Sequence, residues 1–134
     1  IDYQKQILAN AKKLSSALMD NGIDIVSNGT ANHMFLVNLV KNNLTGKVLD
    51  AALGEAHITV NKNSVPNDPQ SPFVTSGIRI GTPAVTRRGF KENEMNMIAK
   101  WITDIIHDVD NIKLIENTKN EVRDLCLQFP VYSR

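Results

Sequence analysis

A polar, proline-rich stretch at residues 61–76, NKNSVPNDPQSPFVTS, interrupts the apolar pattern of the chain. Pro66, Pro69 and Pro72 exclude a regular helix and a central strand there, because proline lacks a backbone N–H and has a fixed φ. A loop of this length inside a compact domain is usually either functional or disordered. Because prolines restrict the unfolded chain, they favour one fixed course for the loop.

The apolar pattern on both sides of this loop predicts an α+β domain. Before the loop we expect a helix over 2–20, strands at 23–27 and 34–40 joined by a turn around Asn28-Gly29, a helix over 44–56 begun by Thr45, and a strand at 58–60. After it we expect a strand at 77–81, a cap at Thr82-Pro83, a helix over 92–109, and a last helix from 110 or 111 to Pro130. Strands gathered between helices favour a small antiparallel or mixed sheet with helices packed on one face.

Composition narrows the possible functions. The 134 residues are 42% hydrophobic, which is enough for one domain with a real core. Lys plus Arg total 15 and Asp plus Glu 14, and the resulting net charge of +1 does not indicate binding to nucleic acid or to an anionic membrane. Cys126 is the single cysteine, which fits a reducing compartment such as the cytoplasm. The chain begins at Ile1 within a predicted helix, so we interpret it as a piece of a longer protein.

A single arginine, Arg79, lies between two isoleucines in the predicted strand GIRIG. Strand alternation would send Ile78 and Ile80 to one face of the sheet and Arg79 to the other. The arginine could lie on a solvated face or pair with a carboxylate for structure, since most arginines are exposed. Alternatively it binds an anion, because its planar guanidinium matches a carboxylate in a bidentate way. Small residues on both sides leave room for such a ligand.

Side chains of the proline-rich loop could extend this site. Amide and hydroxyl groups for a flat polar ligand come from Asn61, Asn63 and Ser71, and Phe73 offers an apolar wall. The three histidines are scattered, and no Cys/His/Asp spacing resembles a metal site. No serine has a neighbouring His–Asp arrangement in the sequence. We therefore expect a binding site with no metal.

Several long motifs resemble those of the serine hydroxymethyltransferase family. The segment VNKNSVPNDPQSPFVTSGIRIGTPAVTRRGFKE, residues 60–92, is long and compositionally unusual. The segments SNGTANH, LTGKVLDAALGEAHI and LCLQFPVY, at 27–33, 44–58 and 125–132, add to the resemblance. The chain is similar to the C-terminal small domain of that enzyme, as in other fold-type I pyridoxal-phosphate enzymes. Residues 1–134 would form that domain, with residues 1–21 a helix leading in from a large domain.

The resemblance implies an enzyme that uses pyridoxal 5'-phosphate, interconverts serine and glycine, and passes a one-carbon unit to tetrahydrofolate. In that family the arginine of the SGIRIGTP motif binds the substrate carboxylate, and the matching position is Arg79. The family's folate contacts map onto Asn63, Ser71, Pro72 and Phe73. The Schiff-base lysine and the phosphate-binding residues would lie upstream. We therefore expect no catalytic residue and no bound cofactor in these 134 residues, and no activity of the isolated chain.

The resemblance also implies the partners of the full-length enzyme: serine or glycine, tetrahydrofolate, the large domain of the same chain, and a second copy in a cytoplasmic homodimer. It implies neither nucleic acid nor a membrane as partner. Two other classes of protein remain possible on the residues alone. A stand-alone regulatory module could sense a carboxylate through Arg79, and a structural dimerisation domain would need an exposed apolar patch.

Overall fold

The structure is a computed structural model that describes residues 2–26, 34–81 and 89–128. In chain order its elements are α1 (Asp2–Asp20), β1 (Asp24–Ile25), β2 (Met34–Asn38), the 3-10 turn η2 (Val40–Asn42), α2 (Gly46–Glu55), β3 (Asn61–Asn63), β4 (Gly77–Gly81), α4 (Glu92–His107) and α5 (Ile112–Gln128). Short strands between helices confirm the predicted α+β class. Within the described ranges, no helix is both long and apolar enough to cross a membrane.

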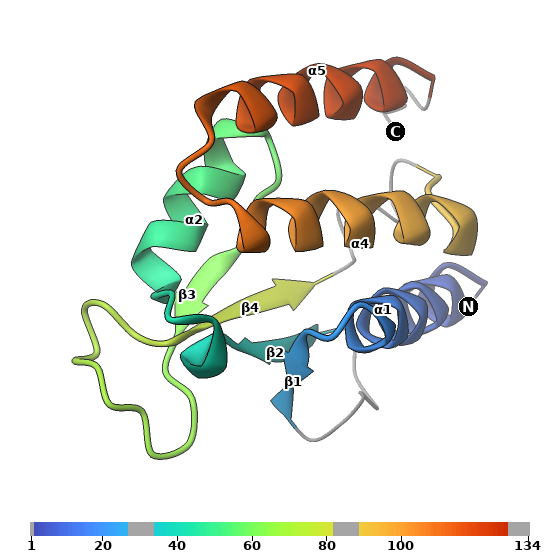
Figure 1. The fold of residues 1–134 in the computed structure, drawn as a ribbon. Helices are drawn as coiled ribbons and strands as arrows, with labels where there is room; N and C mark the ends of the chain where they lie inside the picture. Colours follow the sequence, from blue (N-terminus) through green and yellow to red (C-terminus); the bar gives the residue numbers. More distant parts are fainter. Residues whose placement is uncertain (1, 27–33, 82–88, 129–134) are drawn as a thin grey trace.

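The four strands form one open antiparallel sheet in the order β1-β2-β4-β3. Strand β4 therefore lies inside the sheet, with β2 on one side and β3 on the other. Figure 1 shows α4 and α5 on one side of the sheet, and the loop that joins β3 to β4 projecting away from them. This arrangement confirms the predicted small antiparallel sheet with helices packed on one face.

The core lies between the sheet and the helices. From the sheet, Phe35, Val37, Ile78 and Ile80 are buried in it. The apolar stripe of α4 faces them, with Met95, Ile98, Trp101, Ile102 and Ile105 all buried. Each fully buried side chain of this size stabilises the fold by about 1.5–3 kcal/mol relative to an exposed one. The helix side of the sheet is therefore where most of the apolar burial occurs.

A buried polar contact fixes where α4 begins relative to α1. Asn10 has an exposed fraction of 0% and donates from Nδ2 to the carbonyl oxygen of Phe90 at 2.9 Å. Gln6 donates from Nε2 to Oδ1 of Asn10 at 2.9 Å and to Oε1 of Glu92 at 2.8 Å. The hydrogen bond from Gln6 is the main reason that the pKa of the Glu92 carboxyl is lowered from its usual value. Two helices distant in sequence are thereby joined.

The predicted strand at 58–60 is wrong, because the observed strand β3 begins at Asn61. The backbone N–H of Ile58 donates to the carbonyl of Leu53 at 2.8 Å, and that of His57 donates to Gly54 at 3.0 Å. These are the two hydrogen bonds of a Schellman motif, and His57 takes the left-handed conformation that the motif requires, with φ of 66°. The backbone after α2 is thus used to end the helix, so the strand starts three residues later.

Other predicted boundaries are close to the observed ones. Strand β1 is shorter than the predicted 23–27, and β2 ends at Asn38 because η2 follows it. Helix α4 ends at His107, two residues before the predicted limit. The turn at 28–29, the cap at 82–83 and the stop at 130 lie outside the described residues.

The predicted cap at Thr45 is confirmed, and a second cap is observed at Asn111. Thr45 caps α2, since its Oγ1 accepts from the N–H of Val48 at 3.2 Å. Asn111 caps α5 in the same way, accepting at Oδ1 from the N–H of Leu114 at 3.0 Å. Of the two predicted start points for the last helix, 110 and 111, the second is therefore the observed cap.

Candidate functional site

Arg79 is the central residue of β4 and points away from the core. Its neighbours Ile78 and Ile80 are buried, whereas Arg79 is exposed, as strand alternation predicts. In the register of the sheet it lies opposite Leu36 on β2 and Asn61 on β3. Residues directly opposite in antiparallel strands share a face. Arg79 therefore lies in the middle of the face that α4 and α5 leave uncovered, which we call the open face.

The Arg79 guanidinium has no hydrogen bond and no ion pair with the residues that the structure describes. This excludes a structural ion pair with a described carboxylate, whereas an arginine on a solvated face and an arginine that binds an anion both agree with it. An exposed guanidinium with all its donors available can bind a carboxylate in a bidentate way. The geometry of this part of the chain therefore leaves the anion-binding interpretation possible.

Asn63 shares the open face with Arg79. It lies opposite Gly77 in the register, while Asn61 lies opposite Arg79, so Asn63 is diagonal to Arg79 across the strand pair. Diagonal neighbours of this kind are separated by about 7–8 Å. Nδ2 of Asn63 donates to the carbonyl of Ser64 at 2.8 Å, which leaves its Oδ1 available. The structure thus brings two of the predicted site residues together on one face.

The loop over 64–76 is organised around the carboxylate of Asp68. Its Oδ2 accepts from the backbone N–H groups of Val65 at 3.1 Å and Ser76 at 2.8 Å. Its Oδ1 accepts from the N–H of Gln70 at 2.8 Å and the hydroxyl of Ser76 at 2.7 Å. Partial burial raises the pKa of this carboxyl, but the four hydrogen bonds favour the charged form and lower the pKa to about 2. These hydrogen bonds agree with the single course that the prolines favour.

The end of the loop is attached to the first turn of α2. The N–H of Gly46 donates to the carbonyl of Thr75 at 3.1 Å, and that of Lys47 donates to Val74 at 3.1 Å. These N–H groups have no partner within the helix, so the loop supplies their acceptors. A Cβ on Gly46 would collide with the carbonyl oxygen of Gly77 and with Oγ1 of Thr75. The loop and the helix therefore approach as closely as glycine allows.

Ser71, Pro72 and Phe73 form the exposed tip of this loop. The carbonyl of Ser71 accepts from the N–H groups of Val74 at 3.0 Å and Thr75 at 2.9 Å, which closes a turn. Lys62 on β3 donates from Nζ to the carbonyl of Phe73 at 2.7 Å. The Phe73 side chain is 81% exposed. An aromatic ring held in the open by an ordered turn is available to contact a ligand.

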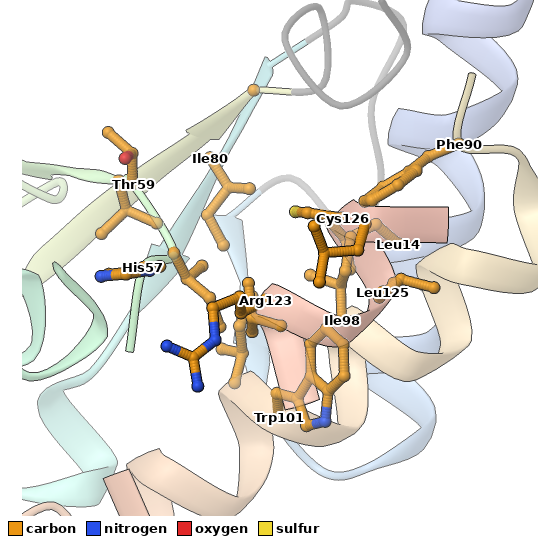
Figure 2. Close-up of a pocket in the computed structure, with 16 residues that line it drawn as sticks. Leu14, His57, Thr59, Ile80, Phe90, Ile98, Trp101, Arg123, Leu125 and Cys126 are labelled. Carbon is orange, nitrogen blue, oxygen red and sulfur yellow. The ribbon is translucent and has the colours of Figure 1, made fainter. Parts of the chain in front are cut away.

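A cavity of about 700 Å³ lies on the other side of the sheet from Arg79. Apolar side chains from α1, α4, α5 and the end of β4 line it, among them Leu14, Ile80, Ile98, Trp101 and Leu125 (Figure 2). Its lining includes Gly81 at the end of β4 and Leu127 on α5. We assign no ligand to it.

A second cavity, of about 470 Å³, lies between the end of α2 and α5. Neither of these two cavities includes Arg79. Arg79 is exposed on the surface of the sheet.

The residues around Arg79 do not fit pyridoxal phosphate by themselves. Lys62 lies opposite Ile78, on the other side of the sheet from Arg79, and its ammonium group is bound to the Phe73 carbonyl. Among the residues that the structure describes, no group of three or more His, Cys, Asp or Glu side chains could hold a metal ion.

Sequence reasoning missed Asp68. A local signal for it exists, because Asp before Pro favours an Asx turn, in which the carboxylate accepts from the N–H two residues later. The observed hydrogen bond from Gln70 is of this kind. The bonds to Ser76 join residues eight positions apart, and no local pattern predicts them.

Comparison with known proteins identifies the family. The family model described as serine hydroxymethyltransferase matches residues 1–102. Serine hydroxymethyltransferases of Dichelobacter nodosus (strain VCS1703A) and Alkalilimnicola ehrlichii (strain ATCC BAA-1101 / DSM 17681 / MLHE-1) are 58% and 54% identical over 132 residues, which cover 98% of this chain and 32% of each relative. That of Pseudoalteromonas atlantica (strain T6c / ATCC BAA-1087) is 58% identical over 131 residues, covering 98% of this chain and 31% of the relative.

The chain thus spans about a third of the length of the curated relatives it matches. All three relatives carry the name of an enzyme, so the alternative of a stand-alone regulatory module finds no support. The match of the family model extends from α1 through β4 and into α4, and it includes Arg79 and the loop over 64–76. The chain belongs to the serine hydroxymethyltransferase family.

Proposed function

We propose that residues 1–134 are the C-terminal small domain of a serine hydroxymethyltransferase, with α1 leading in from a large domain. The full-length protein would interconvert serine and glycine and transfer a one-carbon unit to tetrahydrofolate. Support comes from relatives that match 98% of this chain but extend to about three times its length. The same resemblance supports a homodimer in the cytoplasm.

The observation that carries the proposal is the exposed guanidinium of Arg79 at the centre of the open face, which has no hydrogen bond or ion pair with the described residues. A substrate carboxylate would complete its hydrogen bonds in a bidentate arrangement. At about 4 Å and an effective dielectric constant near 20, the attraction between two such charges is roughly 4 kcal/mol. Fixing the carboxylate also orients the bonds at the α-carbon, which contributes to lowering the barrier. Arg79 is in this role a binding residue for serine and glycine.

The loop and the neighbouring strand would receive the folate. Asn63 offers an amide oxygen on the same face as Arg79, and Ser71 offers a hydroxyl at the loop tip. Pro72 and the exposed ring of Phe73 offer apolar surface to a flat ring system. Because the loop joins β3 to β4, amino acid and folate would approach the same edge of the domain.

Pyridoxal phosphate would be bound by the rest of the full-length protein, which would also form the facing wall of the pocket. When bound, the cofactor supplies an electron sink for the chemistry at the α-carbon. The part played by the present residues is to bind and orient the two substrates. Covering the open face would also remove water from around Arg79, which strengthens its attraction for a carboxylate.

Substitution of Arg79 in the full-length enzyme tests the proposal. In Arg79→Lys the charge remains, but an ammonium group cannot reproduce the planar fork. We expect serine affinity to fall by roughly 10- to 100-fold, measured by calorimetry. Arg123→Lys is the matched control, because Arg123 is exposed on α5 and donates only to Asn120 among its described neighbours. Unchanged serine affinity in Arg79→Lys would reject the assignment.

The isolated 134-residue chain offers a second test. We expect it to show no turnover with serine and tetrahydrofolate and no change in the absorbance of added pyridoxal phosphate, because the cofactor site would lie elsewhere. Turnover, or an absorbance change that saturates with the chain, would contradict this division of roles.

A further inference from the structure

The four donors around Asp68 come from both arms of the loop. Val65 belongs to the arm that leaves β3, and Ser76 to the arm that enters β4. Gln70 lies between Asp68 and the tip. Each carboxylate oxygen accepts two of the four hydrogen bonds, at distances between 2.7 and 3.1 Å. One side chain thus joins the start, the middle and the end of the loop.

Both arms are fixed to the core independently of the tip. Val65 is buried against Gly77, where an added Cβ would lie 2.6 Å from its Cγ1. Val74 and Thr75 accept from the first turn of α2, and the carbonyl of Ser76 accepts from the N–H of Leu39 at 2.8 Å. The tip between these arms has its own turn and the bond from Lys62. Asp68 joins both arms to each other and to Gln70, the residue that precedes the tip.

We propose that Asp68 is a positioning residue for the folate co-substrate: by joining both arms of the loop, its carboxylate fixes the Ser71–Phe73 tip relative to Arg79 on β4. This inference rests on the proposed function, because it requires that the tip contacts folate. Asp68 itself touches neither substrate in this role. It acts through the backbone that carries the tip.

The chemistry of the site requires a carboxylate. Two carboxylate oxygens offer about four lone-pair sites, and four donors occupy them here. An asparagine would place an NH₂ group against two of those donors, so half of the network would be lost. Full occupancy has a second consequence, because a carboxylate with no lone pair left does not compete with the substrate for the Arg79 guanidinium.

The lowered pKa of Asp68 agrees with this arrangement. With a value of about 2, the group stays charged at any pH at which an enzyme assay is run. The causes of the shift are partial burial and the four hydrogen bonds, and no charged side chain is among them. Folate affinity governed by this carboxylate is therefore expected to be independent of pH above about 4.

The test uses the full-length enzyme and two substitutions of different severity. Asp68→Asn removes two of the four hydrogen bonds, and Ser76→Ala removes only the 2.7 Å bond from the hydroxyl. Asp124→Asn, at an exposed position on α5, is the control for loss of one negative charge. The readouts are the Kd of tetrahydrofolate by calorimetry, the Kd of serine, and the amide hydrogen exchange of residues 70–76.

We expect Asp68→Asn to weaken tetrahydrofolate binding by roughly tenfold or more, with serine binding unchanged within about twofold. Ser76→Ala should show a smaller loss of the same kind and should fold even if Asp68→Asn does not. Amide exchange of residues 70–76 should accelerate in both variants, and Asp124→Asn should match the unsubstituted protein. Equal losses of serine and folate affinity would overturn the inference, since a positioning role at the tip affects folate selectively.

Phe73→Ala separates this inference from the proposed function. If Phe73→Ala weakens folate binding while Asp68→Asn and Ser76→Ala leave it unchanged, the folate site stands and the positioning role of Asp68 fails. If Phe73→Ala and Ser71→Ala both leave folate affinity unchanged, the tip does not bind folate, and the proposed folate site fails together with the inference built on it.

Discussion

The two faces of the sheet are built by different kinds of interaction, although the same strand contributes to both. On the helix side, Ile78 has an exposed fraction of 0% and belongs to a continuous apolar core. On the open face, the next residue, Arg79, is exposed and has no described partner. The stability of the domain is therefore expected to reside in one face and its binding function in the other.

The loop that joins β3 to β4 is intermediate between these two faces in how strongly it is stabilised. It has a defined course that comes mainly from hydrogen bonds to Asp68 and to the first turn of α2, with Val65 as its buried apolar side chain. A typical hydrogen bond contributes about 1 kcal/mol net, whereas a buried aliphatic side chain contributes about 1.5–3 kcal/mol. Substitutions should therefore affect stability in the order core, then loop junction, then surface.

The largest expected difference in the free energy of unfolding is between substitutions at two adjacent residues of β4. Ile78→Ala should reduce the free energy of unfolding by about 3–4 kcal/mol, because it leaves a cavity in the core. Arg79→Ala should change it by about 0.5 kcal/mol or less, as for most exposed sites. Urea unfolding of the 134-residue chain measures both. Similar losses for the two variants would mean that the faces are not divided in this way.

The next effect concerns the junction between the loop and α2. Gly46→Ala should destabilise the chain by about 2–3 kcal/mol, because the new Cβ collides with backbone and side-chain oxygens of the loop. Gly54→Ala in the same helix is the matched control, since an added Cβ there meets nothing within 4 Å. Helix propensity predicts that this control stabilises by about 0.5–1 kcal/mol. Equal effects of both substitutions would show that loop and helix are not in close contact.

A smaller effect depends on pH. The pKa of Asp68 is about 2 in the folded chain, below its usual 3.8, so folding favours the charged form. The resulting stabilisation, roughly 1–2 kcal/mol, is fully present above pH 4 and is lost as the pH falls through about 2. In Asp68→Asn, thermal unfolding between pH 5 and pH 2 should therefore show a weaker dependence on pH. An identical slope in both proteins would contradict the network around Asp68.

The smallest effect is at the end of α2. His57 has φ of 66°, a conformation that glycine adopts without strain. His57→Gly should stabilise the chain by about 0.5–1 kcal/mol. Because His57 has no part in the proposed site, serine and folate affinities of the full-length enzyme should not change. Weaker substrate binding in this variant would extend the functional region beyond the open face.

The sequence predicts the faces of the sheet better than it predicts the loop. Alternation of apolar and charged residues in GIRIG is a local signal, and it correctly separates Ile78 from Arg79. The cap at Thr45 is equally local. By contrast, Asn61 begins a strand only because β4 offers it an edge, and asparagine has a low strand propensity. The contacts of Asp68 with Ser76 likewise depend on how the loop folds back.

The most direct test of the central claim asks whether Arg79 recognises the carboxylate itself. Glycine and glycinamide differ in that group alone, so the ratio of their affinities in the full-length enzyme measures how strongly the carboxylate is preferred. We expect the unsubstituted protein to prefer glycine by tenfold or more, on the order of 1.4 kcal/mol, and Arg79→Lys to lose most of that preference. A preference for glycine that is the same in both proteins would contradict the role of Arg79.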